Sequence, residues 1–550
     1  MIRNTEHVNR MRPWLWVIPI FLVSLIFILD PRYFSSPPLR SDDWNWLVEP
    51  QIFDPLKWIV LSDRRPLISF LFAVVTPLLG LNISLYYVMN WFLLFATGII
   101  YHEIIKNAFP KTTWLALPAA LLFLIYPVNY ARTWLILSPI TLSLLAALSA
   151  ILLFVLFAKT GKLLFMVVGN LLFLFSLGIY ESSFGIVMLA ALTLSIFPKD
   201  APRNRRIGMV IPILMGIGFM AWRVFLQPRF FGVQDEYLTN VSLSIPTILS
   251  RYVQGFFIFL FNWVGPLLFI FGDYKYYVFV GILILAALVF AFLLPGIKKS
   301  ARSNPDYVYS ERKQKINTLL KITGLGLVFW AAGYIPVISL YQPIFYGDSS
   351  RVNYSAIPGG ALALTAGIAS LITLIKSNKS NPQRALLYAI LPLVILGMVF
   401  QVVSQNERNQ IWETNKALWQ SMFRLAPNFE DGTIVVIAIP GFTELAPFEM
   451  LPFHGDWEIQ SALHVLYNNP SLFGEYFYID LPNHPDNWFP IDDDYSRFVF
   501  LYFEPQTSSL SVVEDPKDLF SILFDVADYS PQLRLKDGFP DTYLYRFLLD

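Results

Sequence analysis

Two adjacent aspartates, Asp42 and Asp43, stand in the stretch PPLRSDDWNWLVEP, between one long apolar run and the next. Trp44 and Trp46 follow them, with amphipathic rings that prefer the membrane–water interface. A carboxylate among aromatic rings is partly desolvated, which raises its basicity and helps it to take a proton from a hydroxyl group. The pair is therefore a candidate general base at a membrane surface. Two ordinary solvated loop aspartates are the alternative.

The two carboxylates are expected to play unequal roles. In an extended loop, adjacent side chains point to opposite sides. Only one of Asp42 and Asp43 would then face a given acceptor, and the other would hold the loop or a divalent cation. The sequence leaves open which of the two is the base.

Basic residues that suit a phosphate follow in the stretch SDRRPL. Arg64 and Arg65 precede an apolar segment, and paired guanidinium donors match the oxygens of a phosphate. Ordinary contacts with lipid headgroups would also explain them.

Three turns between apolar segments supply further candidates for substrate binding. Glu181 lies in GIYESSFG, and ionisable residues in such a setting are usually functional. Arg351 and Tyr354 lie in YGDSSRVNYSAIPGG, and Arg132 lies in NYARTW. The alternatives are an exposed turn acid at Glu181 and a loop ion pair of Arg351 with Asp348, which would contribute little.

The composition places these residues in a polytopic membrane protein. Of the 550 residues, 55% are hydrophobic and 14% are charged, and the mean hydropathy is +0.53. Soluble domains are about 25% charged, and apolar runs of about 20 residues indicate transmembrane helices. The first run follows Arg3, Arg10 and Arg12 without a small-residue cleavage site, so we interpret it as a retained helix. The predicted spans are about eleven, at 14–30, 84–106, 114–127, 138–158, 163–179, 183–198, 207–226, 277–296, 316–338, 357–375 and 385–403.

Alternate connections between these spans are rich in Lys and Arg, which indicates a cytoplasmic N-terminus. The alternation holds only if two other apolar stretches do not span. The stretch 66–80 is short and contains Pro77, and the stretch 251–272 is broken by Asn262 and Pro266. We expect both to be re-entrant or interfacial helices on the outer side. All the candidate residues then lie on the outer face.

The charge divides the chain near residue 403. Residues 404–550 contain 23 Asp and Glu but 8 Lys and Arg, whereas the chain as a whole has a net charge of +1. We therefore expect a membrane region at 1–403 with a first outer loop at 31–83, a connecting helix at 404–429, and an acidic soluble domain at 430–550 on the outer side. Its strand-like segments, 433–441, 497–504 and 543–549, predict an α/β or mixed-β fold.

The sequence lacks the motifs of several common nucleotide and metal sites. The chain has no cysteine, no GxxxxGK[ST] phosphate loop and no HExxH zinc helix. The acidic IDDDYS lacks the glycine and the closing glutamate of a calcium loop. Contacts of the basic loops with cytoplasmic lipid headgroups explain those loops without a nucleic-acid partner.

The order of these motifs resembles the GT-C superfamily of polytopic glycosyltransferases, which includes protein O-mannosyltransferases and the lipid A aminoarabinose transferase. The resemblance rests on SDDW after the first span, RRPL before a segment ending in LLGLN, YES at an outer turn and SSRVNY before a late span. It covers about 10–425, and the tail matches no family pattern. Several relatives have Asp–Glu where this chain has Asp42 and Asp43.

The resemblance implies transfer of a sugar from a polyprenyl-phosphate donor to a hydroxyl acceptor at the outer face of a bacterial plasma membrane. Asp42 or Asp43 would activate the acceptor for inverting attack, and arginines would stabilise the departing lipid phosphate. Two other classes stay open. A transporter or lipid flippase would need polar residues near the middle of the bilayer, and a non-catalytic subunit of polysaccharide assembly would use the tail alone.

Overall fold

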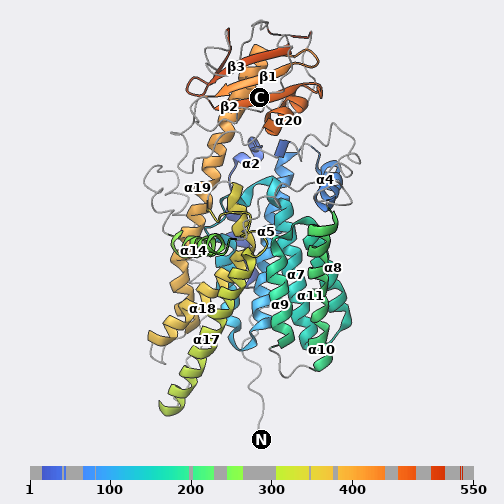
Figure 1. Cartoon of the computed structure of the whole chain (residues 1–550). Coiled ribbons are helices and arrows are strands. Elements are labelled where there is room, and N and C mark those ends of the chain that lie inside the picture. Colours follow the sequence, from blue (N-terminus) through green and yellow to red (C-terminus); the bar gives the residue numbers. More distant parts are fainter. Residues whose placement is uncertain are drawn as a thin grey trace.

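In the computed structural model of the chain, a bundle of long helices carries a small β-sheet at one end (Figure 1). The structure describes residues 15–39, 43–44, 66–80, 82–196, 202–227, 244–263, 305–345, 348–375, 382–439, 456–478, 497–514, 533 and 535–536. The helical elements before the sheet are α1 (Val17–Ser24), η1 (Leu25–Phe27), α2 (Arg32–Ser35), α4 (Pro66–Leu79), α5 (Ile83–Ala108), η4 (Pro110–Leu115), α6 (Ala116–Ile125), η5 (Tyr130–Thr133), η6 (Leu135–Leu137), α7 (Ser138–Thr160), α8 (Leu163–Ile179), η7 (Glu181–Ser183), α9 (Phe184–Ile196), α10 (Arg203–Gly208), α11 (Val210–Ala221), η8 (Trp222–Leu226), α14 (Ile245–Phe261), α17 (Pro305–Tyr334), η9 (Asp348–Ala356), α18 (Ile357–Ile375) and α19 (Pro382–Leu425).

Six helices of the described part are long and apolar enough to cross a membrane. Each predicted span that falls on described residues coincides with a helix, but four of these helices are shorter than 18 residues. The predicted span 277–296 lies outside the described residues. The six membrane-length helices agree with the predicted membrane character, and the count of about eleven spans is not confirmed. The six long helices are Ile83–Ala108, Leu135–Thr160, Arg203–Leu226, Arg312–Tyr334, Ser350–Ile375 and Gln383–Leu425.

The stretch 66–80 and the described part of the stretch 251–272, residues 251–263, each belong to a short helix or its end, α4 and α14. The 14 residues of α4 cover about 21 Å at 1.5 Å per residue, less than the roughly 30 Å of a hydrocarbon core. Figure 1 shows α14 end on, so its axis lies across the axes of the long helices. Arg251 anchors α14 by donating a hydrogen bond from Nη1 to the carbonyl oxygen of Ile338, at 2.7 Å. Their place at a membrane interface stays a prediction.

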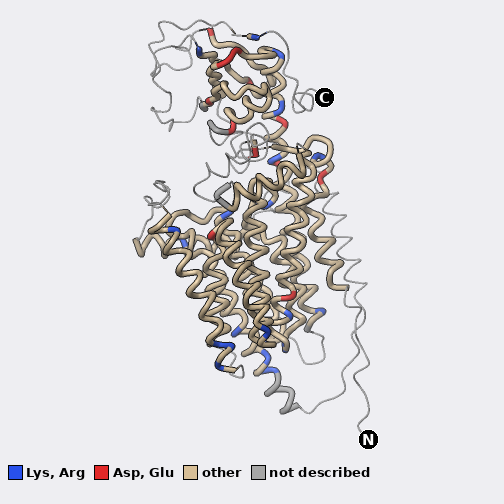
Figure 2. The backbone as a smooth tube through the Cα atoms, turned by 90° about the vertical axis from the view of Figure 1, so that its right-hand side faces the viewer, with Lys and Arg blue, Asp and Glu red and all other residues tan. Residues whose placement is uncertain are grey.

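The basic connections gather at one end of the bundle. Figure 2 shows many of the Lys and Arg residues at the end opposite the sheet. That end carries the C-termini of α5, α7 and α18 and the N-termini of α8, α17 and α19 (Figure 1). The positive-inside rule assigns this end to the cytoplasm, and that orientation stays a prediction.

The sheet has four strands in the order β2-β1-β3-β4. Strands β1 (Ile434–Ile439) and β3 (Phe498–Glu504) match the predicted strands 433–441 and 497–504; the predicted strand 543–549 lies outside the described residues. Strand β1 pairs in parallel with β2 (Phe473–Tyr478) and β3, and it is buried along its whole length, as expected of a central parallel strand. Strand β4 (Ser509–Val512) is antiparallel to β3, and α20 (Asp456–Leu466) packs on β2.

One helix joins the membrane bundle to the sheet. The last predicted span and the connecting helix are a single helix, α19, whose 44 residues extend over about 66 Å. Met422 and Phe423, near its C-terminus, are buried, and the Phe423 ring lies 5.2 Å from that of Tyr467. The last turns of α19 therefore belong to the core of the sheet domain.

Candidate functional site

Asp43, in the predicted first outer loop, is buried against the corner between α6 and α7, which is formed by residues 126–137. Its side chain is 2% exposed, and its Oδ1 accepts a hydrogen bond from the backbone N–H of Ile136, at 2.8 Å. Residues 43 and 44 are helical, which corrects the prediction of an extended loop. An amide N–H suits a carboxylate anion, so the contact fixes Asp43 relative to α7.

Trp44 fixes the same loop from the other side. Its ring is fully buried, with the Trp412 ring centroid at 6.4 Å and the Trp419 ring centroid at 6.2 Å. These two tryptophans are seven residues apart on α19 and therefore lie on one face of that helix. This packing of Trp44 against Trp412 and Trp419, the tryptophan clamp, restricts the backbone at residue 43.

Arg408 of α19 links the loop to the corner. Its guanidinium is 2% exposed and donates hydrogen bonds to the hydroxyl oxygens of Tyr33 and Thr133. Asp43 lies close enough for the two buried charges to attract each other. A buried cation bonded on two sides holds the first loop, η5 and α19 in one arrangement.

Tyr33 completes this contact. Its ring is fully buried and stacks on the ring of Tyr87, with centroids 4.2 Å apart. Burial raises the pKa of Tyr33 from 10.0 to about 12, and the nearby Arg408 charge opposes part of that increase. The hydroxyl therefore stays protonated at neutral pH and does not neutralise Arg408. Tyr87 in turn donates a hydrogen bond to the carbonyl oxygen of Pro38, at 2.8 Å.

A second group of polar side chains anchors the start of the loop. Asp30 accepts hydrogen bonds from Arg32 Nη2 at 2.8 Å and from Asn409 Nδ2 at 2.7 Å. Arg32 also donates to Asn406 Oδ1, at 3.3 Å. One face of α19 thus holds both ends of the short segment that precedes Asp43.

Arg132 builds the corner itself. Its side chain is 1% exposed, and Nη1 donates to the carbonyl oxygen of Phe123 at 3.0 Å and to that of Leu124, at the C-terminal end of α6. The guanidinium faces the rings of Phe27, Phe123 and Tyr354 at 5.3–5.6 Å. The contacts described are internal, so the structure gives Arg132 a positioning role. Its predicted contact with a substrate stays a prediction.

The segments that carry the remaining candidates meet next to this corner. Element η9 packs against η5 and η7, so Arg132, Glu181, Arg351 and Tyr354 lie on three contacting segments. Tyr354 is 2% exposed and donates to Thr141 Oγ1 at 3.0 Å, whereas Glu181 and Arg351 are partly exposed. The structure therefore brings these four predicted positions together, with Tyr354 turned inward.

Three predicted site residues, Asp42, Arg64 and Arg65, lie outside the described residues. The possible divalent cation at the aspartate pair also stays a prediction. Among the described neighbours of Asp43 are an amide N–H and the Arg408 cation, which do not fit a metal ion, and the described residues contain no group of three metal-ligating side chains. We therefore derive no step through a metal.

Sequence reasoning missed Arg408 and Tyr33. The missed signal is SQNERNQ at 404–410, where a charged pair interrupts an apolar helix. Ionisable residues inside membrane helices are rare and usually functional. The predicted span ends at residue 403, so the sequence places this stretch outside the membrane. There, charged and polar residues indicate only an ordinary solvent-exposed surface.

Comparison of the chain with protein-family models and with curated proteins gives no match. The function is therefore inferred from the geometry of Asp43 and its neighbours.

Proposed function

We propose that the protein is a membrane glycosyltransferase that moves a sugar from a polyprenyl-phosphate donor to a hydroxyl acceptor on the outer face of the membrane. The observation that carries the proposal is the setting of Asp43. It is a buried carboxylate held by Ile136 N–H and a tryptophan clamp, beside the buried cation Arg408. Solvated loop aspartates, the alternative, have neither burial nor a built environment of this kind.

In the proposed reaction, Asp42 or Asp43 takes the proton of the acceptor hydroxyl. The acceptor oxygen forms a bond to the anomeric carbon from the face opposite the leaving group, and the bond from that carbon to the phosphate oxygen breaks. The lipid phosphate leaves with the electron pair of that bond. Inversion at the anomeric carbon follows from this single displacement.

The departing phosphate gains negative charge, which arginines can stabilise. Arg351 is the described candidate, because it is partly exposed on η9, and Arg64 and Arg65 are the candidates from the sequence. Donors placed where charge develops contribute roughly 3–4 kcal/mol each in comparable sites. Arg408 and Arg132 are buried by protein contacts, so we assign them to positioning rather than to contact with the donor.

The test is transfer of a labelled sugar from polyprenyl phosphate in membranes that contain matched amounts of each variant. Asp42→Asn and Asp43→Asn keep size and hydrogen bonding but remove the base, so the residue that acts as base should lose about 10²–10⁴-fold in rate. Substitution of the aspartate that holds the loop should lower the thermal stability of the protein as well as the rate of transfer. Arg64→Lys and Arg65→Lys should weaken donor use while some turnover survives.

Equal and full activity of both Asn variants would contradict the assignment of the pair. Lipid movement without sugar transfer would favour the transporter or flippase. A protein that supports polysaccharide assembly in cells but performs neither sugar transfer nor lipid movement would favour the non-catalytic assembly subunit.

A further inference from the structure

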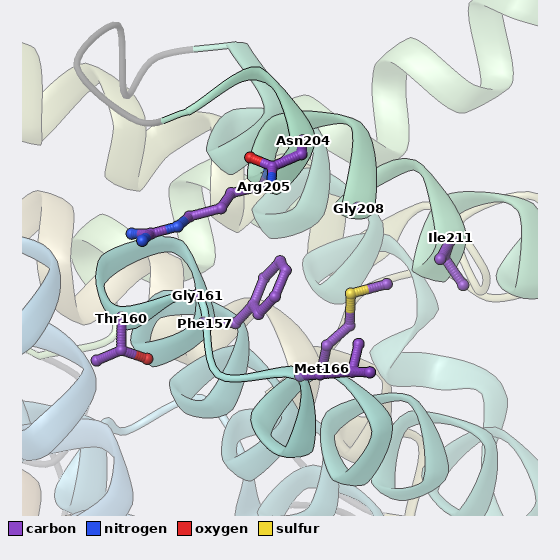
Figure 3. Close-up of a pocket in the computed structure, with 9 residues that line it drawn as sticks. Phe157, Thr160, Gly161, Met166, Asn204, Arg205, Gly208 and Ile211 are labelled. Atoms are coloured by element: carbon purple, nitrogen blue, oxygen red, sulfur yellow. The ribbon is translucent and has the colours of Figure 1, made fainter.

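A pocket of about 420 Å³ opens at the basic end of the bundle, between the α7–α8 turn and the helices α10 and α11 (Figure 3). It lies at the opposite end of the bundle from Asp43 and is independent of the proposed reaction. The side chains that line it are apolar on one side and polar on the other. The lining residues are Phe157, Thr160, Gly161, Leu163, Met166, Asn204, Arg205, Gly208 and Ile211.

The inner wall of the pocket is apolar and depends on a glycine. Phe157 and Met166 are buried at 6% and 5% exposure. A Cβ atom at Gly208 would lie 3.1 Å from Phe157 Cε1 and 3.2 Å from Met166 Sδ, which is closer than ordinary contact. Glycine at this position therefore preserves the space.

The rim of the pocket is cationic. Arg205 extends over the turn that carries Thr160 and Gly161 (Figure 3), and its Nη1 donates to the carbonyl oxygen of Lys159, at 2.8 Å. Lys159 and Lys162 flank this turn in the sequence, and Arg203 and Arg206 flank the lining residues of α10. None of these five cations forms an ion pair with a carboxylate in the described part of the chain. The rim thus carries a concentrated positive charge.

An apolar surface continues from the pocket along the outside of the bundle. The lining residues Leu163 and Ile211 are 66% and 44% exposed. The neighbouring helices α8 and α11 contact each other, and both expose further large apolar side chains. These are Leu164, Val167, Val168, Leu171, Val210, Leu214 and Ile217. In a membrane protein such a surface faces acyl chains.

From the cationic rim, the apolar wall and the exposed apolar path beyond it, we infer that the pocket binds an anionic phospholipid. The headgroup phosphate lies at the rim, and an acyl chain follows the surface between α8 and α11. Basic pockets between membrane helices at the cytoplasmic side bind acidic lipids in this manner. A free phosphate would use the rim alone and gain nothing from the apolar wall.

The test is a thermal-shift titration of the purified full-length protein in neutral detergent, with phosphatidylglycerol, phosphatidylcholine, glycerophosphoglycerol and inorganic phosphate as separate ligands. Phosphatidylglycerol should stabilise the protein with saturation, and the other three should need concentrations at least tenfold higher. Native mass spectrometry should show one phosphatidylglycerol that is retained longest.

Lys162→Glu is the test variant, and Lys111→Glu is its control. Both lysines are exposed at the basic end and both changes alter the charge by two units, but Lys111 is not next to a lining residue. Each cation near a lipid surface contributes about 1 kcal/mol, so Lys162→Glu should weaken phosphatidylglycerol binding about thirtyfold, and Lys111→Glu less than threefold. Leu163→Gln removes apolar contact without charge and should weaken phosphatidylglycerol binding but leave the binding of glycerophosphoglycerol unchanged.

Equal losses in the two Glu variants would overturn the inference in favour of diffuse attraction over the whole basic end. No loss in either variant would also overturn it. Equal binding of glycerophosphoglycerol or phosphate would show an anion site without a lipid, and equal binding of phosphatidylcholine would show an apolar groove without charge selection.

Discussion

Replacing Arg408 by methionine should destabilise the protein far more than the same change at Arg32. Arg32 lies in the segment before Asp43 and Arg408 contacts that segment, so the two substitutions can be compared. Arg408 is 2% exposed and donates to Tyr33 and Thr133, whereas the Arg32 side chain is 40% exposed and pairs with Asp30.

The expected magnitudes follow from burial. Removing one partner of a buried charge pair leaves the other charge uncompensated and costs about 3–5 kcal/mol. The Arg32–Asp30 pair is partly exposed, with side-chain exposures of 40% and 12%, and an ion pair near the surface contributes about 0–1 kcal/mol. Arg408→Met should therefore lower the free energy of unfolding by about 3–5 kcal/mol and Arg32→Met by no more than about 1 kcal/mol. Arg408→Lys keeps the charge but loses one of two charged hydrogen bonds, so we expect a loss of about 1.5–3 kcal/mol.

The assay is equilibrium unfolding of the purified protein in mixed micelles, followed by circular dichroism, together with sugar transfer in membranes. Arg408→Met should also lower transfer, because Asp43 loses the cation beside it, and Arg32→Met should leave transfer within about threefold of wild type. Equal destabilisation by the two methionine variants would refute the reasoning that Arg408 holds the loop in place.

Three further predictions concern Tyr33, the sheet domain and the membrane topology. The pKa of Tyr33 is raised to about 12 in the folded protein, so its contribution of roughly 3 kcal/mol to the free energy of unfolding should be complete below pH 10 and be lost as the pH rises toward 12. Unfolding of wild type and Tyr33→Phe across this range measures the difference. The free energy of unfolding of a fragment at 416–550 should exceed that of a fragment at 430–550 by at least about 4 kcal/mol, because the shorter fragment lacks buried Met422 and Phe423. Comparable melting of the two fragments would contradict this. The chain has no cysteine, so single cysteines can report the topology. A membrane-impermeant maleimide should label Thr507→Cys in intact cells and Lys111→Cys only after permeabilisation. Labelling of both positions from one side of the membrane would refute the predicted topology.

Apolar periodicity and charge predicted the membrane character, the helices and two strands because these are properties of continuous segments. The stretch 66–80 was correctly predicted to be a short helix, because its limited apolar length is visible in the sequence. The boundary at residue 403 separated a predicted span from a predicted connecting helix, and the structure joins the two in the single helix α19. A polar stretch resembles an exit from the membrane, and only tertiary packing reveals that 404–410 continues the helix toward buried partners.

The candidate site was predictable as a set of segments but not as a set of contacts. The alternation of basic loops placed Arg132, Glu181, Arg351 and Tyr354 at one end, and η5, η7 and η9 do meet there. Their orientations depend on packing between distant elements. Arg132 points into the bundle because carbonyl oxygens at the end of α6 and three aromatic rings surround it, and no local pattern records those partners.

The central claim is that the Asp42–Asp43 pair performs sugar transfer, and the double variant Asp42→Asn, Asp43→Asn tests it most directly. The measurement is the initial rate of labelled-sugar transfer from polyprenyl phosphate in membranes with matched amounts of wild-type and variant protein. The proposal predicts a fall of at least about 10²-fold in the double variant, with inverted anomeric configuration in the wild-type product. Full transfer by the double variant would contradict it.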